Sequence, residues 1–183
     1  MIQQIPGRTL NDDPVSIDIS QNYFSFLEND IEIVYSGIES GFEEIHDQQS
    51  FFKGNQISWD ELSKNFDVKR DKTDCIIEEL DQCARLSKGV YVVELCHKPG
   101  GGGTTVARRV AYELHREFPI IIISKYHKEK TADLIFQMAE MTRKPVIAVI
   151  EAHSVSKNEL NLLIRSVNSD KKHLIIFPSF ALI

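Results

Sequence analysis

The sequence predicts an α/β fold in which a parallel β-sheet carries helices on both faces. In the second half of the chain, continuous apolar runs alternate with amphipathic stretches four times. Strands that are covered on both faces read as such runs, and their alternation with helices specifies parallel pairing. We therefore expect an α/β core over residues 89–183, preceded by a mainly helical N-terminal segment over residues 1–88.

The elements of the core follow one another in a regular order. The expected strands and helices are 90–95, 104–118, 119–124, 131–144, 145–152, 158–169 and 173–177. In the first of the helices, Val106, Val110, Leu114 and Phe118 recur at four-residue intervals and form one apolar stripe. In open parallel sheets, ligands bind at the carboxyl ends of the strands, so we look for the site there.

The N-terminal segment is predicted from local signals. Residues 1–20 read as a loop, and residues 22–44 are expected to hold two helical stretches. Ser58 and Glu61 form a capping box, which starts a short helix at Trp59. Residues 71–87 form an amphipathic helix that ends before Gly89.

Composition limits the classes of function. The net charge is −6, which does not support binding of nucleic acid or of acidic membranes. The sequence holds no apolar run long enough to span a membrane and no signal-peptide pattern at its start. Cys75, Cys83 and Cys96 fit no zinc or disulfide framework, so we expect free thiols and a cytoplasmic protein.

A glycine-rich turn joins the first core strand to the first core helix. Such a turn lets backbone N–H groups point inward, and the start of the helix adds further N–H groups and the positive end of a dipole. Strand, glycine loop and helix together are the context of a phosphate-binding P-loop. The expected nucleotide-binding residues are Pro99, Gly100, Gly101, Gly102, Gly103, Thr104 and Thr105.

Two registers relate this turn to the G-x-x-x-x-G-K-[ST] motif, and both lack the phosphate-binding lysine. In one, Thr104 takes the lysine's place and Thr105 supplies the magnesium hydroxyl. In the register that we prefer, His97 takes the place of the first glycine, Gly103 that of the lysine, and Thr104 holds Mg²⁺. That register predicts stronger nucleotide binding in Gly103→Lys.

The missing lysine should weaken nucleotide binding and slow phosphoryl transfer, because it neutralises phosphate charge. Lys98, Arg108 and Lys125 are candidate substitutes. A glycine-rich turn without any ligand is the alternative interpretation.

Glu151 ends the third apolar run, where P-loop enzymes place an acid that holds magnesium or its water. We expect Glu151 to act as the metal-side carboxylate, together with Thr104, or as the catalytic base. An ordinary carboxylate at a strand end is the alternative. Ser179 is the candidate polar sensor after the fourth run, and Val68 to Arg70 are placed to cover the nucleobase or to form a solvated basic turn.

The residues 51–59 (FFKGNQISW) and 97–105 (HKPGGGGTT) resemble a known group. Residues 31–177 are similar to the P-loop region of the sterile-alpha-motif-domain-containing interferon-induced antiviral proteins and their STAND NTPase relatives. The resemblance implies a nucleotide-controlled switch in an innate-immunity or antiviral protein, with effector domains and repeat sensors in larger relatives. The chain departs from the group in its single acid at Glu151 and in the lack of an arginine after residue 177. It also ends at Ile183, before a fifth strand and a lid, so we expect a truncated core.

The leading hypothesis is a STAND-like module that binds ATP or GTP with Mg²⁺ and hydrolyses it slowly or not at all. As partners we expect the nucleotide and protein partners or further domains of a larger signalling protein. The main alternative is a non-catalytic interaction scaffold with a degenerate P-loop, which would dock a partner through its aromatic N-terminal half. A small-molecule kinase is a third reading, but it needs an acceptor site and an arginine-bearing lid.

Overall fold

The fold is built on one twisted, mostly parallel sheet. The structure is a computed structural model and describes residues 2–7, 14–18, 30–38, 56–128, 130–151, 154–169 and 173–181. The strand order is β3-β6-β7-β8-β4, and β5 pairs with β8 beyond β4. The strands are β3 (Ile31–Val34), β4 (Val90–Val92), β5 (Leu95–His97), β6 (Ile120–Ile123), β7 (Val146–Ile150) and β8 (Leu174–Ala181). All pairs are parallel except β3 with β6, so the predicted parallel core is confirmed.

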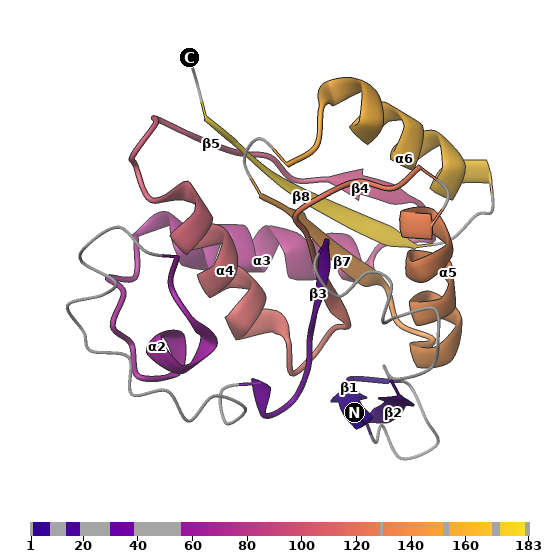
Figure 1. The fold of residues 1–183 in the computed structure, drawn as a ribbon, viewed down its shortest axis with the longest axis horizontal. Coiled ribbons are helices and arrows are strands. Elements are labelled where there is room, and N and C mark those ends of the chain that lie inside the picture. Colours follow the sequence, from indigo (N-terminus) through magenta and orange to yellow (C-terminus); the bar gives the residue numbers. More distant parts are fainter. Residues whose placement is uncertain are drawn as a thin grey trace.

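Helices cover both faces of this sheet, as predicted (Figure 1). One face carries α2 (Trp59–Ser63), α3 (Lys72–Arg85) and α4 (Gly103–Leu114), and the other carries α5 (Lys130–Thr142) and α6 (Lys157–Ser169). In β6 the side chains alternate: Ile120 and Ile122 pack with α4, whereas Ile121 and Ile123 pack with α5. All four are fully buried, which explains why the strand is an unbroken apolar run.

The N-terminal segment contributes strands that the sequence did not predict. Residues 31–34, expected within a helical stretch, form β3, which pairs antiparallel with β6 and places Ile31 opposite Ile123. The β-branched residues of β3 suit a sheet position, and tertiary pairing overrides a weak local helical signal. Two further strands, β1 (Ile2–Ile5) and β2 (Val15–Asp18), form an antiparallel pair where a loop was expected.

The strand that leads into the glycine loop is interrupted. Instead of one strand over 90–95, β4 and β5 flank Val93 and Glu94 and keep the same register on β8: Val90 pairs with Leu174 and Leu95 with Ser179. The backbone N–H of Val93 still donates to the Ile176 carbonyl, at 2.9 Å. β8 is longer than the predicted strand because it has to pair with both segments.

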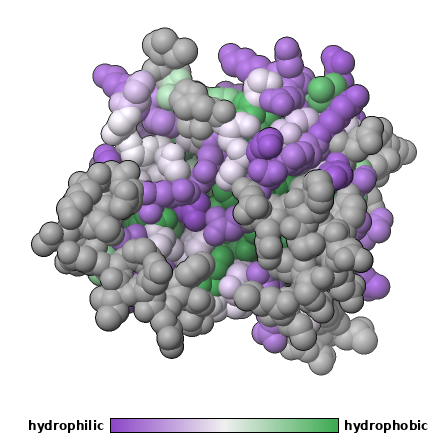
Figure 2. All heavy atoms as spheres, in the orientation of Figure 1, coloured by the Kyte–Doolittle hydropathy of each residue, from purple (hydrophilic) through white to green (hydrophobic). Residues whose placement is uncertain are grey.

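Polar side chains cover most of the described surface that Figure 2 displays, and apolar ones show mainly between them. The most exposed large apolar side chain in the described part of the chain is Val68, at 82%. Within the described ranges, no helix is long and apolar enough to cross a membrane. Residues 51–55, which belong to the first block of the family resemblance, lie outside the described residues.

Candidate functional site

The glycine loop lies between β5 and the start of α4. Gly100 and Gly102 have φ angles of +72° and +77°, which side-chain-bearing residues seldom adopt. The N–H of Gly101 donates to the Lys98 carbonyl at 2.8 Å, and the N–H of Val106 donates to Gly102 at 3.0 Å. Gly102 is the N-cap of the helix. The N–H groups of residues 103–105, which come before Val106 in the first turn, therefore have no acceptor within the helix and are available to an anion.

The helix begins at Gly103, one residue before the predicted start. Gly103 is buried, whereas Thr104 and Thr105 are half-buried in the first turn. Both hydroxyl-bearing residues thus stand at the end of the helix that carries the positive dipole, where a phosphate-bound cation would be held. The structure is compatible with either threonine as the magnesium ligand, so the assignment to Thr104 stays a prediction.

A cavity of about 210 Å³ opens beside the loop. Its walls come from the glycine loop and α4 on one side and from the segment before α3 on the other; the lining residues are Asp67, Val68, Arg70, Thr73, Gly100, Gly102, Thr105, Val106 and Arg109. Nucleotide-sized ligands usually occupy pockets of about 300 Å³ or more, so this cavity has room for only part of a nucleotide. Val68 and Arg70 line the cavity, and their expected role as a cover for the nucleobase stays a prediction.

A buried ion pair fixes this covering segment to α4. Arg109 Nε donates to Asp67 Oδ2 at 2.9 Å, and Arg109 Nη2 binds the other carboxylate oxygen and, at 2.9 Å, the Leu62 carbonyl. The carboxylate, together with that of Glu113, raises the pKa of the Arg109 guanidinium. Because the pair is almost inaccessible, it orders the wall of the cavity. Local sequence patterns held no signal for it, since the partners are 42 residues apart.

His97 and Gly103 are in direct contact. A Cβ added to Gly103 would lie 2.0 Å from Cδ2 and 2.1 Å from Nε2 of the His97 ring, a separation that real Cβ atoms do not show. The ring is held by Ser179, whose Oγ lies 3.1 Å from Nε2, and by the Lys98 carbonyl, 3.0 Å from Nδ1. Ser179, the predicted sensor, therefore contacts the loop through His97.

Glu151 follows β7 directly and is already engaged. Its Oε1 accepts hydrogen bonds from Arg108 Nη1 at 3.1 Å and from Gln56 Nε2 at 2.9 Å. Arg108 also binds Glu32 at 3.0 Å and stacks on Trp59, with Cζ 4.5 Å from the ring centroid. Arg108, a candidate for the missing lysine, is thus committed to two carboxylates. Glu32 was missed because β3 was not recognised.

The other two candidate cations are not placed at the loop interior. Lys98 is exposed. Lys125 is also exposed and follows β6, and in the sheet β7 and β8 lie between β6 and β4, so Lys125 is far from the loop. Arg70, which the sequence analysis did not consider for this role, lies closer: its Nη2 is 3.3 Å from the point where a Cβ on Gly102 would sit.

Two of the described residues offer oxygen donors for a nucleotide-bound Mg²⁺, although nowhere in the described ranges do three His, Cys, Asp or Glu side chains gather as a metal site. Mg²⁺ in nucleotide sites needs no such cage, since it is held by one or two protein oxygens, phosphates and water. The hydroxyl of Thr104 and the carboxylate of Glu151 are suitable donors, but Glu151 has to share its charge with Arg108.

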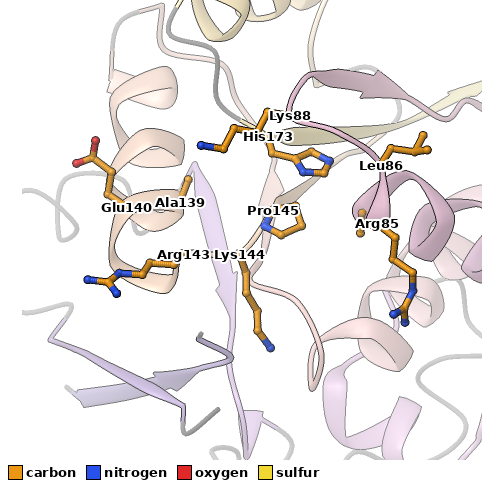
Figure 3. Close-up of a pocket in the computed structure, with 10 residues that line it drawn as sticks. Arg85, Leu86, Lys88, Ala139, Glu140, Arg143, Lys144, Pro145 and His173 are labelled. Carbon is orange, nitrogen blue, oxygen red and sulfur yellow. The ribbon is translucent and has the colours of Figure 1, made fainter. Parts of the chain in front are cut away.

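A larger cavity, of about 650 Å³, lies at the opposite end of the sheet (Figure 3). Pro145 and His173, which precede β7 and β8, line it together with the ends of α3 and α5. Its basic side chains include Arg85, Arg143 and Lys144. This end of the sheet meets the C-termini of α3 and α5, which offer no free backbone N–H donors and carry the negative end of the dipole. The glycine loop is therefore the better phosphate site.

Comparison with known proteins agrees with this geometry. A family model described as Novel STAND NTPase 5 matches residues 49–179. Human sterile alpha motif domain-containing protein 9 is 33% identical over 95 residues, which is 47% of this chain and 6% of that protein. The mouse sterile alpha motif domain-containing protein 9-like is 32% identical over 96 residues, which is 48% of this chain and 6% of the relative. The chain thus matches only a small part of these relatives.

Two solved structures are similar at low sequence identity. The structure of C. elegans PCH-2 gives a TM-score of 0.49 at 16% identity, with 68% of this chain and 41% of that chain covered. A katanin structure gives a TM-score of 0.42 at 12% identity, with 90% of this chain and 54% of that chain covered.

The family match rests on the sequence and includes the whole glycine loop, α4 and Glu151. The chain therefore belongs to the novel STAND NTPase family and forms a P-loop nucleotide-binding module.

Proposed function

We propose that this chain is a STAND-type switch, in which ATP or GTP with Mg²⁺ shifts a conformational equilibrium in an innate-immunity or antiviral signalling protein. The observation that carries the proposal is the P-loop itself: Gly100 and Gly102 at positive φ, the free start of α4, and the adjoining cavity under Val68–Arg70. The signalling context is taken from the matched relatives and is part of the proposal.

Hydrolysis should be slow or absent. The loop has no lysine at the motif position that neutralises the phosphates. In addition, the expected catalytic base Glu151 accepts a hydrogen bond from Arg108, which competes with water for the carboxylate. A nucleotide that is held rather than turned over suits a switch.

Other ligands are less well supported. Of the four basic side chains that could contact nucleic acid near the loop, Arg70 lines the cavity, whereas Lys69, Arg108 and Arg109 form ion pairs with Asp74, with Glu32 and Glu151, and with Asp67. Their charges are therefore not free for a phosphate backbone.

We place the protein in the cytoplasm, in keeping with three cysteines that form no disulfide.

Thermal melting with Mg-ATP, Mg-GTP and their non-hydrolysable analogues tests this function. A ligand that binds the folded state raises the melting temperature, and the effective nucleotide identifies the base. Thr104→Ala and Thr105→Ala are matched variants, one residue apart in the same turn. Loss of the shift only in Thr104→Ala supports our register, and loss only in Thr105→Ala supports the other.

No shift with any nucleotide in the wild-type chain would contradict the proposal. That result would favour the interaction scaffold with a degenerate P-loop. A phosphate-release assay on the same samples measures turnover. Rapid release would overturn the slow-hydrolysis part, while leaving nucleotide binding intact.

A further inference from the structure

The cavity wall opposite the glycine loop carries a buried hydroxyl without a protein partner. Thr73, in the first turn of α3, lines the cavity of about 210 Å³ and is 1% exposed. Its Oγ1 has no hydrogen-bond partner in the described part of the chain. A buried hydroxyl that stays unpaired destabilises the folded state. Its place in the wall of a cavity therefore points to a ligand that supplies the missing partner.

Arg70 brings a positive charge to the same wall. It lines the cavity, and its Nη2 lies 3.3 Å from the position that a Cβ on Gly102 would take. Among the described residues, no side chain or backbone group forms an ion pair or hydrogen bond with this guanidinium. Arginine stays protonated in proteins, so Arg70 presents an unpaired cation to the glycine loop.

The start of α3 holds Arg70 and Thr73 next to each other. The Thr73 N–H donates to the Arg70 carbonyl at 2.9 Å, and the N-cap residue Asp71 makes no side-chain hydrogen bond to this turn. α3 and α4 pack against each other on one face of the sheet (Figure 1). Because both helices begin at the cavity, the positive ends of two helix dipoles lie beside it, which favours an anionic ligand.

The carboxylate in the cavity lining is neutralised within the protein. Asp67 lines the cavity, but it is bound to Arg109, which lines it as well. Lys69 is paired with Asp74 and is not among the lining residues. The uncompensated charge of the lining is therefore the positive charge of Arg70.

We propose that Arg70 and Thr73 bind the phosphate chain of the nucleotide from the side opposite the glycine loop. The guanidinium of Arg70 supplies the charge that the missing lysine would bring, through N–H groups that can contact two phosphate oxygens. The hydroxyl of Thr73 donates a hydrogen bond to the same chain. This inference rests on the proposed function, because it assigns residues within that same site.

Matched substitutions on the full chain test both contacts. Arg70→Gln removes the charge at the cavity, whereas Lys72→Gln removes an equal charge from an exposed side chain two residues away that does not line it. Thr73→Val keeps the shape of the side chain without the hydroxyl, and Thr73→Ser keeps the hydroxyl. Isothermal titration calorimetry gives dissociation constants for Mg-ATP at low and high KCl. Thermal melting without nucleotide gives the stability of each variant.

We expect Arg70→Gln to weaken Mg-ATP binding at least about tenfold. The affinity that remains should depend less on KCl than in the wild type, because salt screens a charged contact. Lys72→Gln should leave both the affinity and its salt dependence nearly unchanged.

Thr73→Val should have opposite effects on binding and on stability. Mg-ATP binding should weaken about threefold to tenfold, since one hydrogen bond is lost. The melting temperature without nucleotide should rise, because an unpaired buried hydroxyl has been removed. Thr73→Ser, which retains the hydroxyl, should bind more tightly than Thr73→Val. A purely structural role of Thr73 predicts no such opposition.

The inference is wrong if Arg70→Gln or Thr73→Val binds Mg-ATP as tightly as the wild type. It is also wrong if Lys72→Gln loses as much affinity as Arg70→Gln, since a charge without contact would then explain the loss. A Thr73→Val variant that melts below the wild type would assign the hydroxyl a structural role instead. In these cases nucleotide binding by the wild type, and with it the proposed function, stands. If the wild type binds no nucleotide, both proposals fall.

Discussion

Arg108 on α4 donates a hydrogen bond from Nη1 to Oε1 of Glu151, at the end of β7, over 3.1 Å. The same guanidinium binds Glu32 on β3. Both ends of the Arg108–Glu151 pair are largely shielded from solvent, with side-chain exposures of 8% and 16%. Hence the carboxylate that we expect on the metal side is neutralised by the protein, and Mg²⁺ has to compete with Arg108 for it.

Glu151→Gln should remove the dependence of nucleotide binding on Mg²⁺. The amide keeps an acceptor for Arg108 but loses the charge that a divalent cation needs. We expect a cost of about 1–2 kcal/mol in the free energy of unfolding. The measurement is thermal melting with ATP, with and without Mg²⁺. Glu32→Gln is the matched control, since it loses the other carboxylate on Arg108; an equal loss of the Mg²⁺ effect there would refute the role of Glu151.

Asp67→Ala should strongly destabilise the fold. It leaves Arg109, whose side chain is 4% exposed, without its main counter-charge, and breaking such a buried pair costs about 3–5 kcal/mol. Glu113→Ala removes the other partner of Arg109, which is 39% exposed, and should cost less than about 1 kcal/mol. Equilibrium unfolding in urea measures both. Equal effects would show that burial does not set the energy of this cluster.

Gly102→Ala should lower the free energy of unfolding by about 1–2 kcal/mol, because an L-residue is strained at the φ angle of +77° found there. Gly89→Ala is the control: its φ is not positive, and the nearest atoms to an added Cβ belong to Tyr91 at an ordinary 3.7 Å. Urea unfolding of the two variants separates backbone strain from the mere addition of a methyl group. A neutral Gly102→Ala would contradict the described loop conformation.

His173 should make stability depend on pH. Burial lowers its pKa below the ordinary 6.5, although the hydrogen bond to the Cys83 carbonyl acts in the opposite direction. The unfolded chain then takes up a proton at a higher pH than the folded chain. The contribution of His173 is therefore full above pH 6.5 and is lost as the pH falls through the folded-state pKa.

Urea midpoints at several values between pH 8 and pH 5 measure this dependence. His173→Gln retains a donor for the Cys83 carbonyl without titrating, so the variant should show a flatter pH profile than the wild type. An unchanged profile would assign the pH dependence to other groups.

The core could be predicted from the sequence because its signals are local. The tetrad Ile120–Ile123 reads as a doubly covered strand, and the Ser58–Glu61 capping box, present in the structure, sets the start of α2. β3 could not be predicted in this way, since four residues carry little periodicity and their strand state depends on pairing with β6.

In the site, too, some residues could be predicted from local signals, whereas their contacts depend on tertiary pairing. The glycine loop was predicted from motif spacing, and Glu151 from its place at the end of a predicted strand. The contact of His97 with Ser179 joins residues 82 apart in the chain and exists only because β5 pairs with β8. The partners of Glu151 likewise come from α4 and from the segment before α2, so their identity depends on the tertiary structure.

The common register of β4 and β5 on β8 has a mechanical consequence. The stem of the glycine loop is anchored to β8 both before and after the break at Val93 and Glu94, and Ser179 is part of that same strand. Backbone pairing with β8 thus fixes the stem and Ser179 relative to each other. The opposite wall, Val68–Arg70, is not part of the sheet, and the adjoining Asp67 is held by Arg109 of α4, so the position of this wall follows α4 rather than β8.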